Sequence, residues 1–187
     1  NLKMKIRVLR GKERDPFDSF GFIKDYHSAD AVNVAFFFLS GKPGGIDRNT
    51  DPVNKEWKKL VREISSVFET GIHPSSSANR DERILKREIS TLATITGKTI
   101  RISRQHYLLV RFPITYRRLE QAGITDDFSM GFADRCGFRA GTSRAFNFYD
   151  LEKEIETGLR IRPFAVMDRT LKTYMNLNPG EAEVKIF

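Results

Sequence analysis

Cysteine and long apolar stretches are scarce in this sequence, and both shortages exclude whole classes of protein. A single cysteine, Cys136, among 187 residues excludes an internal disulfide and every zinc site that needs two thiolates. No apolar stretch approaches the roughly 20 residues that a membrane-spanning helix needs, and the first residues do not read as a signal peptide. We therefore expect no membrane span, and we expect a cytoplasmic protein.

Acidic residues are fewer than basic ones. The 24 Asp and Glu residues face 32 Lys and Arg residues, which gives a net charge of +8. Such an excess favours polyanionic partners where it gathers on one face, but most of these bases alternate with acids, as on solvated helix faces. The exception is the basic run from Lys3 to Arg14, which lacks interleaved aromatic residues. We therefore expect a solvated helix end there, with a nucleic-acid or membrane patch as the alternative.

Apolar residues at spacings of three and four predict three amphipathic helices in the middle of the chain. The first is expected within residues 51–71, where Asp51 followed by Pro52 supplies a cap and a first-turn proline. The second and third are expected at residues 84–97 and 113–123. A glycine ends each of the three ranges, as is typical of helix C-termini.

Short β-prone segments separate these helices. A nearly continuous apolar run at residues 32–39 is typical of a strand that is covered on both faces. Further segments lie at residues 71–73, 99–103, 124–127 and 159–167. The alternation predicts a single α/β domain over residues 1–187, with mostly parallel strands in a sheet that is open or closed into a barrel.

The two ends of the sequence read as parts of interrupted helices. Leu2, Ile6 and Leu9 have the spacing of the last turns of a helix, and Pro179 opens a helix that has no cap signal before Phe187. We therefore expect the chain to be a fragment of a larger protein.

Polar residues follow three of the predicted strands, and parallel strands gather ligand groups at their carboxyl ends. His73 follows one strand, Arg104 and His106 follow the next, and neighbouring strands lie about 5 Å apart. Two imidazoles at adjacent strand ends form a reasonable half of a metal site, although a lone histidine is more often structural. Arg104 either binds an anion or holds a carboxylate, or it forms a buried ion pair that supports the sheet.

Residues 71–131 resemble the middle of the polysaccharide deacetylase family. In that family a His-Ser/Thr-x-x-His motif ends one strand, a helix with a terminal Thr-Gly follows, and the next strand ends in Arg-x-Pro-aromatic. Here the corresponding residues are 73–77, Thr96-Gly97 and 104–107. Longer strings are similar to a bacterial branch of deacetylase-like proteins, and they include residues 15–18, 103–106, 128–131, 137–142 and 163–168.

The resemblance implies a divalent metal, for which zinc is the candidate, held by one Asp and two His in a distorted barrel. By that alignment His73 is a metal ligand and Ser77 stands at the second histidine position, and we infer that His106 supplies the missing ligand. Arg104 and Asp127 take the catalytic positions, and we expect Arg139 and Tyr107 to bind substrate. The family's Thr-Phe-Asp-Asp motif is absent. We therefore expect an incomplete (β/α) barrel of the polysaccharide deacetylase type that is inactive as a fragment.

Three functions remain open from the sequence. The first is a metal-dependent hydrolase that removes an acyl group from an N-acetylated sugar or glycan. The second is a non-catalytic carbohydrate-binding barrel that has lost its metal site, which Ser77 favours. The third is a basic nucleic-acid-binding domain, which the net charge of +8 favours. Unpaired edges of an incomplete barrel also predict self-association.

Overall fold

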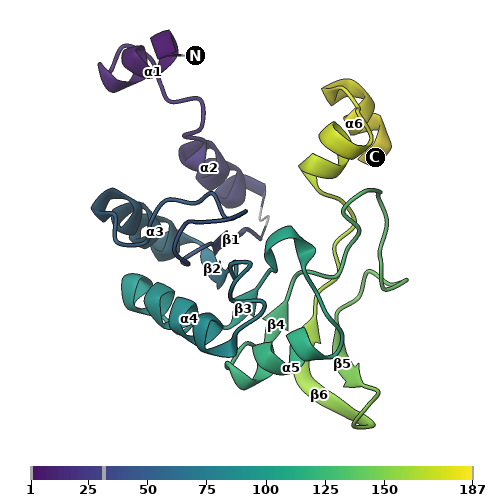
Figure 1. Ribbon diagram of the computed structural model, residues 1–187. Helices are drawn as coiled ribbons and strands as arrows, with labels where there is room; N and C mark the ends of the chain where they lie inside the picture. Colours follow the sequence, from purple (N-terminus) through teal and green to yellow (C-terminus); the bar gives the residue numbers. More distant parts are fainter. Residues whose placement is uncertain (1, 31–32, 187) are drawn as a thin grey trace.

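The computed structural model describes residues 2–30 and 33–186, and its centre is a six-stranded sheet (Figure 1). The strand order is β1-β2-β3-β4-β6-β5, and only β5 is antiparallel to its neighbour. The prediction of an α/β fold with mostly parallel strands is confirmed, and the sheet is open. The strands are β1 (Ala35–Phe38), β2 (Glu69–Ile72), β3 (Ile102–Ser103), β4 (Asp126–Asp127), β5 (Phe146–Asp150) and β6 (Ile155–Ile161).

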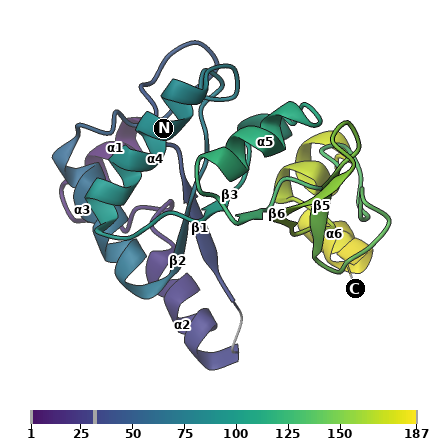
Figure 2. The same cartoon turned by 90° about the horizontal axis from the view of Figure 1, so that it is seen from below.

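Helices α3 (Lys55–Val67), α4 (Glu82–Thr96) and α5 (Ile114–Gln121) connect the parallel strands and lie on one face of the sheet (Figure 2). The main core lies between these helices and the sheet. Helix α2 (Phe20–Asp30) precedes β1, whereas α1 (Leu2–Leu9) and α6 (Pro179–Ile186) contain no buried residues. The core residues with the lowest exposure are Val61, Ile72, Leu92, Leu159 and Ile161.

Both predicted boundaries of the first central helix were wrong. Asn54 is the N-cap of α3, because its side chain accepts a hydrogen bond from the Trp57 N–H at 3.0 Å, and Asp51 lies in the preceding turn. The helix ends at Val67, and Gly71 lies inside β2. The next helix, α4, does end at a glycine, since Gly97 adopts the left-handed conformation with φ 69°.

The C-terminal hairpin departs from the prediction in a different way. Strand β5 was not predicted, and it pairs antiparallel with β6. Strand β6 begins at Ile155 and ends at Ile161, before Pro163, which cannot donate a ladder hydrogen bond. Val32 and Phe187, which the predicted first strand and last helix included, lie outside the described residues.

The uncovered face of the sheet is concave across β1 to β4. The rings of Phe37 in β1 and Phe128 after β4 lie 5.4 Å apart, although two strands separate them. Gly71 on β2 leaves the space that this approach needs, because a Cβ there would lie 2.6 Å from Ile102 Cγ1 and 2.7 Å from Phe37 Cδ1. None of the described helices is long and apolar enough to cross a membrane.

Candidate functional site

The segments that follow β1, β2 and β3 meet at the carboxyl edge of the sheet. His73 continues β2, and its N–H donates to the Phe38 carbonyl of β1 at 2.9 Å. Arg104 continues β3, and its N–H donates to the Ile72 carbonyl at 3.0 Å. These ladder bonds place both residues at one end of the sheet. They border an open pocket of about 520 Å³ together with His106.

His73 and His106 lie side by side at this pocket, as their positions after adjacent strands predict. Their ring centroids are 4.8 Å apart. His73 Nδ1 lies 2.6 Å from the Arg104 carbonyl oxygen, and burial lowers the pKa of His73 to about 4. The ring is therefore neutral at pH 7. Because a carbonyl only accepts, Nδ1 carries the proton and Nε2 keeps its lone pair.

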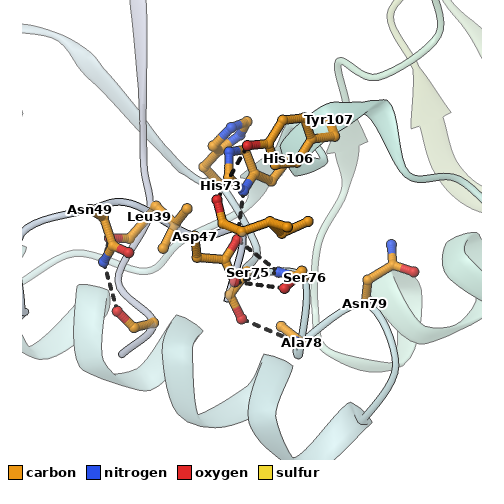
Figure 3. A network of polar contacts seen from close by, with 12 residues as sticks. Leu39, Asp47, Asn49, His73, Ser75, Ser76, Ala78, Asn79, His106 and Tyr107 are labelled. Atoms are coloured by element: carbon orange, nitrogen blue, oxygen red, sulfur yellow. Dashed lines mark hydrogen bonds and ion pairs between the residues drawn. The ribbon is translucent and has the colours of Figure 1, made fainter. Parts of the chain in front are cut away.

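Asp47 is the carboxylate that sequence reasoning missed (Figure 3). Its Oδ1 lies 2.8 Å from His106 Nδ1, and its Oδ2 accepts a 2.7 Å hydrogen bond from Ser76 Oγ. Burial alone would raise the pKa of Asp47, but the hydrogen bonds from Ser76 and His106 outweigh burial and hold the pKa below its ordinary value. The carboxylate is thus an acceptor, so His106 presents a protonated Nδ1 to it. The sequence feature that could have indicated Asp47 is its position in the loop after the first strand.

Arg104 and Asp127, the expected catalytic pair, make no direct ion pair in the described chain. Arg104 Nη1 donates to the Phe128 carbonyl at 2.8 Å, and its guanidinium lies 4.1 Å above the Phe164 ring. Burial lowers the pKa of Arg104, and the Asp127 charge opposes that shift. Arg104 borders the pocket, whereas Asp127 is completely buried and does not.

Hydrogen bonds enclose Asp127 within the sheet layer. It accepts hydrogen bonds from Ser103 Oγ at 2.6 Å, from the Ser129 N–H at 2.9 Å and from Ser129 Oγ at 3.0 Å. Burial outweighs these bonds and raises the pKa of Asp127 to about 6. Ser129 Oγ in turn accepts the N–H of Gln105 at 2.8 Å, so Asp127 is connected to the pocket through Ser129 and Gln105 as well as through its charge near Arg104.

The other three predicted site residues divide between the pocket and the surface. Tyr107 borders the pocket, with its ring 4.1 Å from the His106 ring and its hydroxyl donating to the Ile46 carbonyl at 3.2 Å. The expectation that Arg139 shares this pocket is wrong, because it is exposed, with its guanidinium 5.9 Å from the Phe112 ring. Ser77 borders a separate pocket, because the chain turns outward after Ser76 binds Asp47.

The second wall of the pocket is a segment to which sequence reasoning gave no role. Residues 166–169 and Tyr174 form it, and the buried Thr170 anchors it through a 2.7 Å hydrogen bond to the Ala133 carbonyl. Asp168 and Arg169 are exposed, and their side chains make no hydrogen bond or ion pair within residues 2–30 and 33–186. The pocket is therefore lined by two tyrosine rings and by two charged side chains of opposite sign that have no partner among the described residues.

The histidine pair fits the nitrogen half of a divalent metal site. Metal-binding histidines usually donate their second ring N–H to a carbonyl or carboxylate, as His73 and His106 do. Among the described residues, however, no group of three or more His, Cys, Asp or Glu is placed to hold a metal ion. The described chain thus brings together two candidate ligands, and Ser77 borders a different pocket.

No family model and no curated protein sequence matches this chain. The geometry of the site is therefore the basis for assigning a function.

Proposed function

We propose that this chain forms part of a polysaccharide deacetylase-like hydrolase, which removes an acyl group from an N-acetylated sugar or glycan. The observation that carries the proposal is the His73–His106 pair, with ring centroids 4.8 Å apart at an open pocket of about 520 Å³. That volume lies within the range of sites that bind compounds of the size of a small sugar. A buried carboxylate contacts one ring and a backbone carbonyl contacts the other, so both imidazoles are oriented before any ligand binds.

His73 and His106 would hold a divalent metal through their Nε2 atoms, with zinc as the candidate. A bound metal supplies polarisation of the acyl carbonyl and a water of lowered pKa. Asp47 holds the ring of His106, and the Arg104 carbonyl holds the ring of His73. The guanidinium of Arg104, kept in place by Phe128 and Phe164, donates to the acyl oxygen as negative charge develops there. The negative charge of Asp127 favours the positively charged form of the Arg104 guanidinium.

We also propose that the sheet belongs to an incomplete (β/α) barrel of the polysaccharide deacetylase type. Its support is the concave face across which Phe37 and Phe128 meet, with helices on the opposite face. A hollow of about 540 Å³ on that face is bordered by Ala35, Ile102 and Arg160. The inner wall of a closed barrel has this curvature and this distribution of helices.

The test is a zinc titration of the chain, followed by an assay of N-acetylglucosamine oligomers in the protein that carries it. We expect His73→Ala and His106→Ala each to abolish zinc binding to the chain, whereas His27→Gln, at the third histidine, keeps it. Release of acetate must disappear in the same two variants. Zinc binding that survives both alanine substitutions would remove the basis of the proposal.

The second candidate is a carbohydrate-binding module without catalysis. Two observations favour it: two ligands rather than three are present in the described chain, and Tyr107 and Tyr174 both expose more than half of their surface at the pocket. Aromatic rings of this kind bind the apolar faces of sugars. Glycan binding that is unchanged by a chelator, with no acetate released, would select this candidate over the hydrolase.

A further inference from the structure

Two buried carboxylates accept hydrogen bonds from consecutive serines in the segment after β2. Ser75 donates its N–H to Glu88 Oε2 at 3.0 Å and its hydroxyl to Glu88 Oε1 at 2.5 Å. Ser76 makes the same two kinds of bond to Asp47: its N–H donates to Oδ2 at 3.1 Å, and its hydroxyl donates to Oδ2 at 2.7 Å. The segment is therefore fixed on both sides by charged acceptors, which bind more strongly than neutral ones.

Glu88 lies within α4, far from the histidines in sequence, and is only 4% exposed. The Ser40 hydroxyl donates to its backbone carbonyl at 2.9 Å. A Cβ on Gly41 would overlap Glu88 Oε1 and lie 2.9 Å from Ser75 Cβ, so glycine there lets the first loop pass over this carboxylate. The end of β1, the end of β2 and the middle of α4 thus share one close-packed contact.

Asp47 connects this contact to His106 at the pocket. A carboxylate rotates about its Cβ–Cγ bond unless donors fix it, and the donors here are Ser76 and His106. Ser76 in turn is held by its neighbour Ser75, which Glu88 binds. A shift of the segment would turn Asp47 and release the ring of His106.

We propose that Glu88 is a positioning residue, which holds Ser75 so that Ser76 can fix Asp47 against His106. The inference deepens the proposed function by naming the group on which the orientation of His106, one of its two histidines, depends. Only the kinetic test of this inference relies on the proposed function. The positioning itself can be observed in the chain alone.

The direct test is the ¹H–¹⁵N signal of His106 Nδ1–H in the labelled chain. In the parent we expect a protected signal, because the proton lies in the 2.8 Å contact with Asp47. Glu88→Ala and Ser76→Ala should lose that signal. Glu88→Gln should keep it, since the amide oxygen accepts from the Ser75 N–H and the amide N–H donates to the Ser75 hydroxyl.

Glu63→Ala, at an exposed glutamate of α3, and Ser66→Ala, at an exposed serine of the same helix, are the matched controls and should leave the signal unchanged. A folded Glu88→Ala variant with the parent signal overturns the proposal. If Glu88→Ala does not fold, Ser75→Ala decides in the same way, because it removes one bond to Glu88 and leaves the other.

The kinetic test uses the protein in which the deacetylase activity is assayed. Glu88→Ala should lower kcat roughly tenfold with KM unchanged, the effect typical of losing an outer partner of a ligand. Glu88→Gln should restore most of that loss, and an equal rise in KM would contradict a role in positioning. If the parent itself is inactive, the proposed function fails, whereas the His106 signal still decides the role of Glu88.

Discussion

Asp47 and Asp127 are both buried beside the candidate site, yet their pKa values move in opposite directions. The pKa of Asp47 is below its ordinary value, whereas burial raises that of Asp127 to about 6. At Asp47 the hydrogen bonds from Ser76 and His106 outweigh the effect of burial, whereas at Asp127 burial outweighs the hydrogen bonds from Ser103 and Ser129. The comparison assigns the two carboxylates different roles: Asp47 is a fixed anion, and Asp127 is a group whose charge opposes folding.

The first prediction concerns the pH dependence of stability. A carboxyl whose pKa is higher in the folded than in the unfolded chain adds stability that is present below about pH 4 and lost as the pH rises through about 6. The Asp127→Asn substitution removes the ionisable group and keeps the shape of the side chain, so the loss of stability with rising pH disappears. Relative to the parent, the variant should therefore gain roughly 3 kcal/mol in free energy of unfolding between pH 4 and pH 7.

Urea unfolding at several pH values measures this difference. Asp134→Asn, at an exposed aspartate paired with Arg135, is the control and should track the parent across the range. Parallel stability curves for Asp127→Asn and the parent would show that the charge of Asp127 is compensated in the fold.

The second prediction concerns the affinity of the histidine pair for zinc. Asp47→Asn removes the negative charge behind His106 and turns one acceptor into a donor, so the ring loses its fixed tautomer. We expect zinc to bind about 10- to 100-fold more weakly. Calorimetric titration of the chain measures the affinity, with Asp134→Asn again as the control. An unchanged affinity would mean that His106 is oriented without Asp47.

At the scale of elements, the third prediction separates two possible starts of α3. Asn54→Ala removes the side chain that accepts the Trp57 N–H and should lower the free energy of unfolding by about 1 kcal/mol. Asp51→Ala changes the preceding turn, where Asp51 Oδ1 accepts the Val53 N–H, and should cost less. Thermal and urea unfolding of both variants compare them. A larger loss for Asp51→Ala would move the cap back to the position that the sequence pattern indicated.

The sequence predicted helices best where apolar spacing, a start signal and a stop signal agree, as they do for α4 with its stop at Gly97. It failed for α3, because Asp51 and Asn54 are both good caps and only packing decides between them. Strands β3 and β4 have two residues each and lie inside the predicted segments 99–103 and 124–127, so the sequence indicated these strands but not where they begin. Among the described strands, β5 pairs only with β6, and that pairing depends on a contact that periodicity does not contain.

The candidate site, like the fold, could be predicted only in part from the sequence. Adjacent parallel strands bring His73 and His106 together, and the rule for strand ends was enough to see it. Asp47 reaches His106 from the loop after β1, and Arg169 reaches the pocket from the start of the helical segment at Thr170–Tyr174; both positions depend on the whole fold. Ser77 is one residue past Ser76, and the sequence does not show that the chain turns away between them.

At the scale of the whole molecule, the sheet ends on both sides in strands with one partner. Among the described strands, β1 pairs only with β2, and β5 pairs only with β6. Strand β1 has the sequence Ala-Phe-Phe-Phe and carries no charge, whereas β5 ends in the charged Asp150, which Arg117 binds at 2.5 Å and 2.7 Å. Edge strands without charge or proline are templates for pairing with another chain. The β1 edge thus lacks the charge that protects the β5 edge from pairing with another chain.

The last prediction follows from this difference between the edges: the chain should self-associate through β1 as its concentration rises. Val34→Lys places a charge at the start of that edge, where the side chain is half-buried, and should shift the chain toward the monomer with little loss of stability. Val53→Lys adds the same charge at a turn residue that is 72% exposed, so it separates an effect of the edge from one of net charge. Sedimentation velocity over a range of concentrations measures the average mass of the three chains. If the parent sediments as a monomer throughout, β1 is protected in solution. If Val53→Lys dissociates the assembly as well as Val34→Lys does, general charge repulsion is the cause and the edge is not the interface.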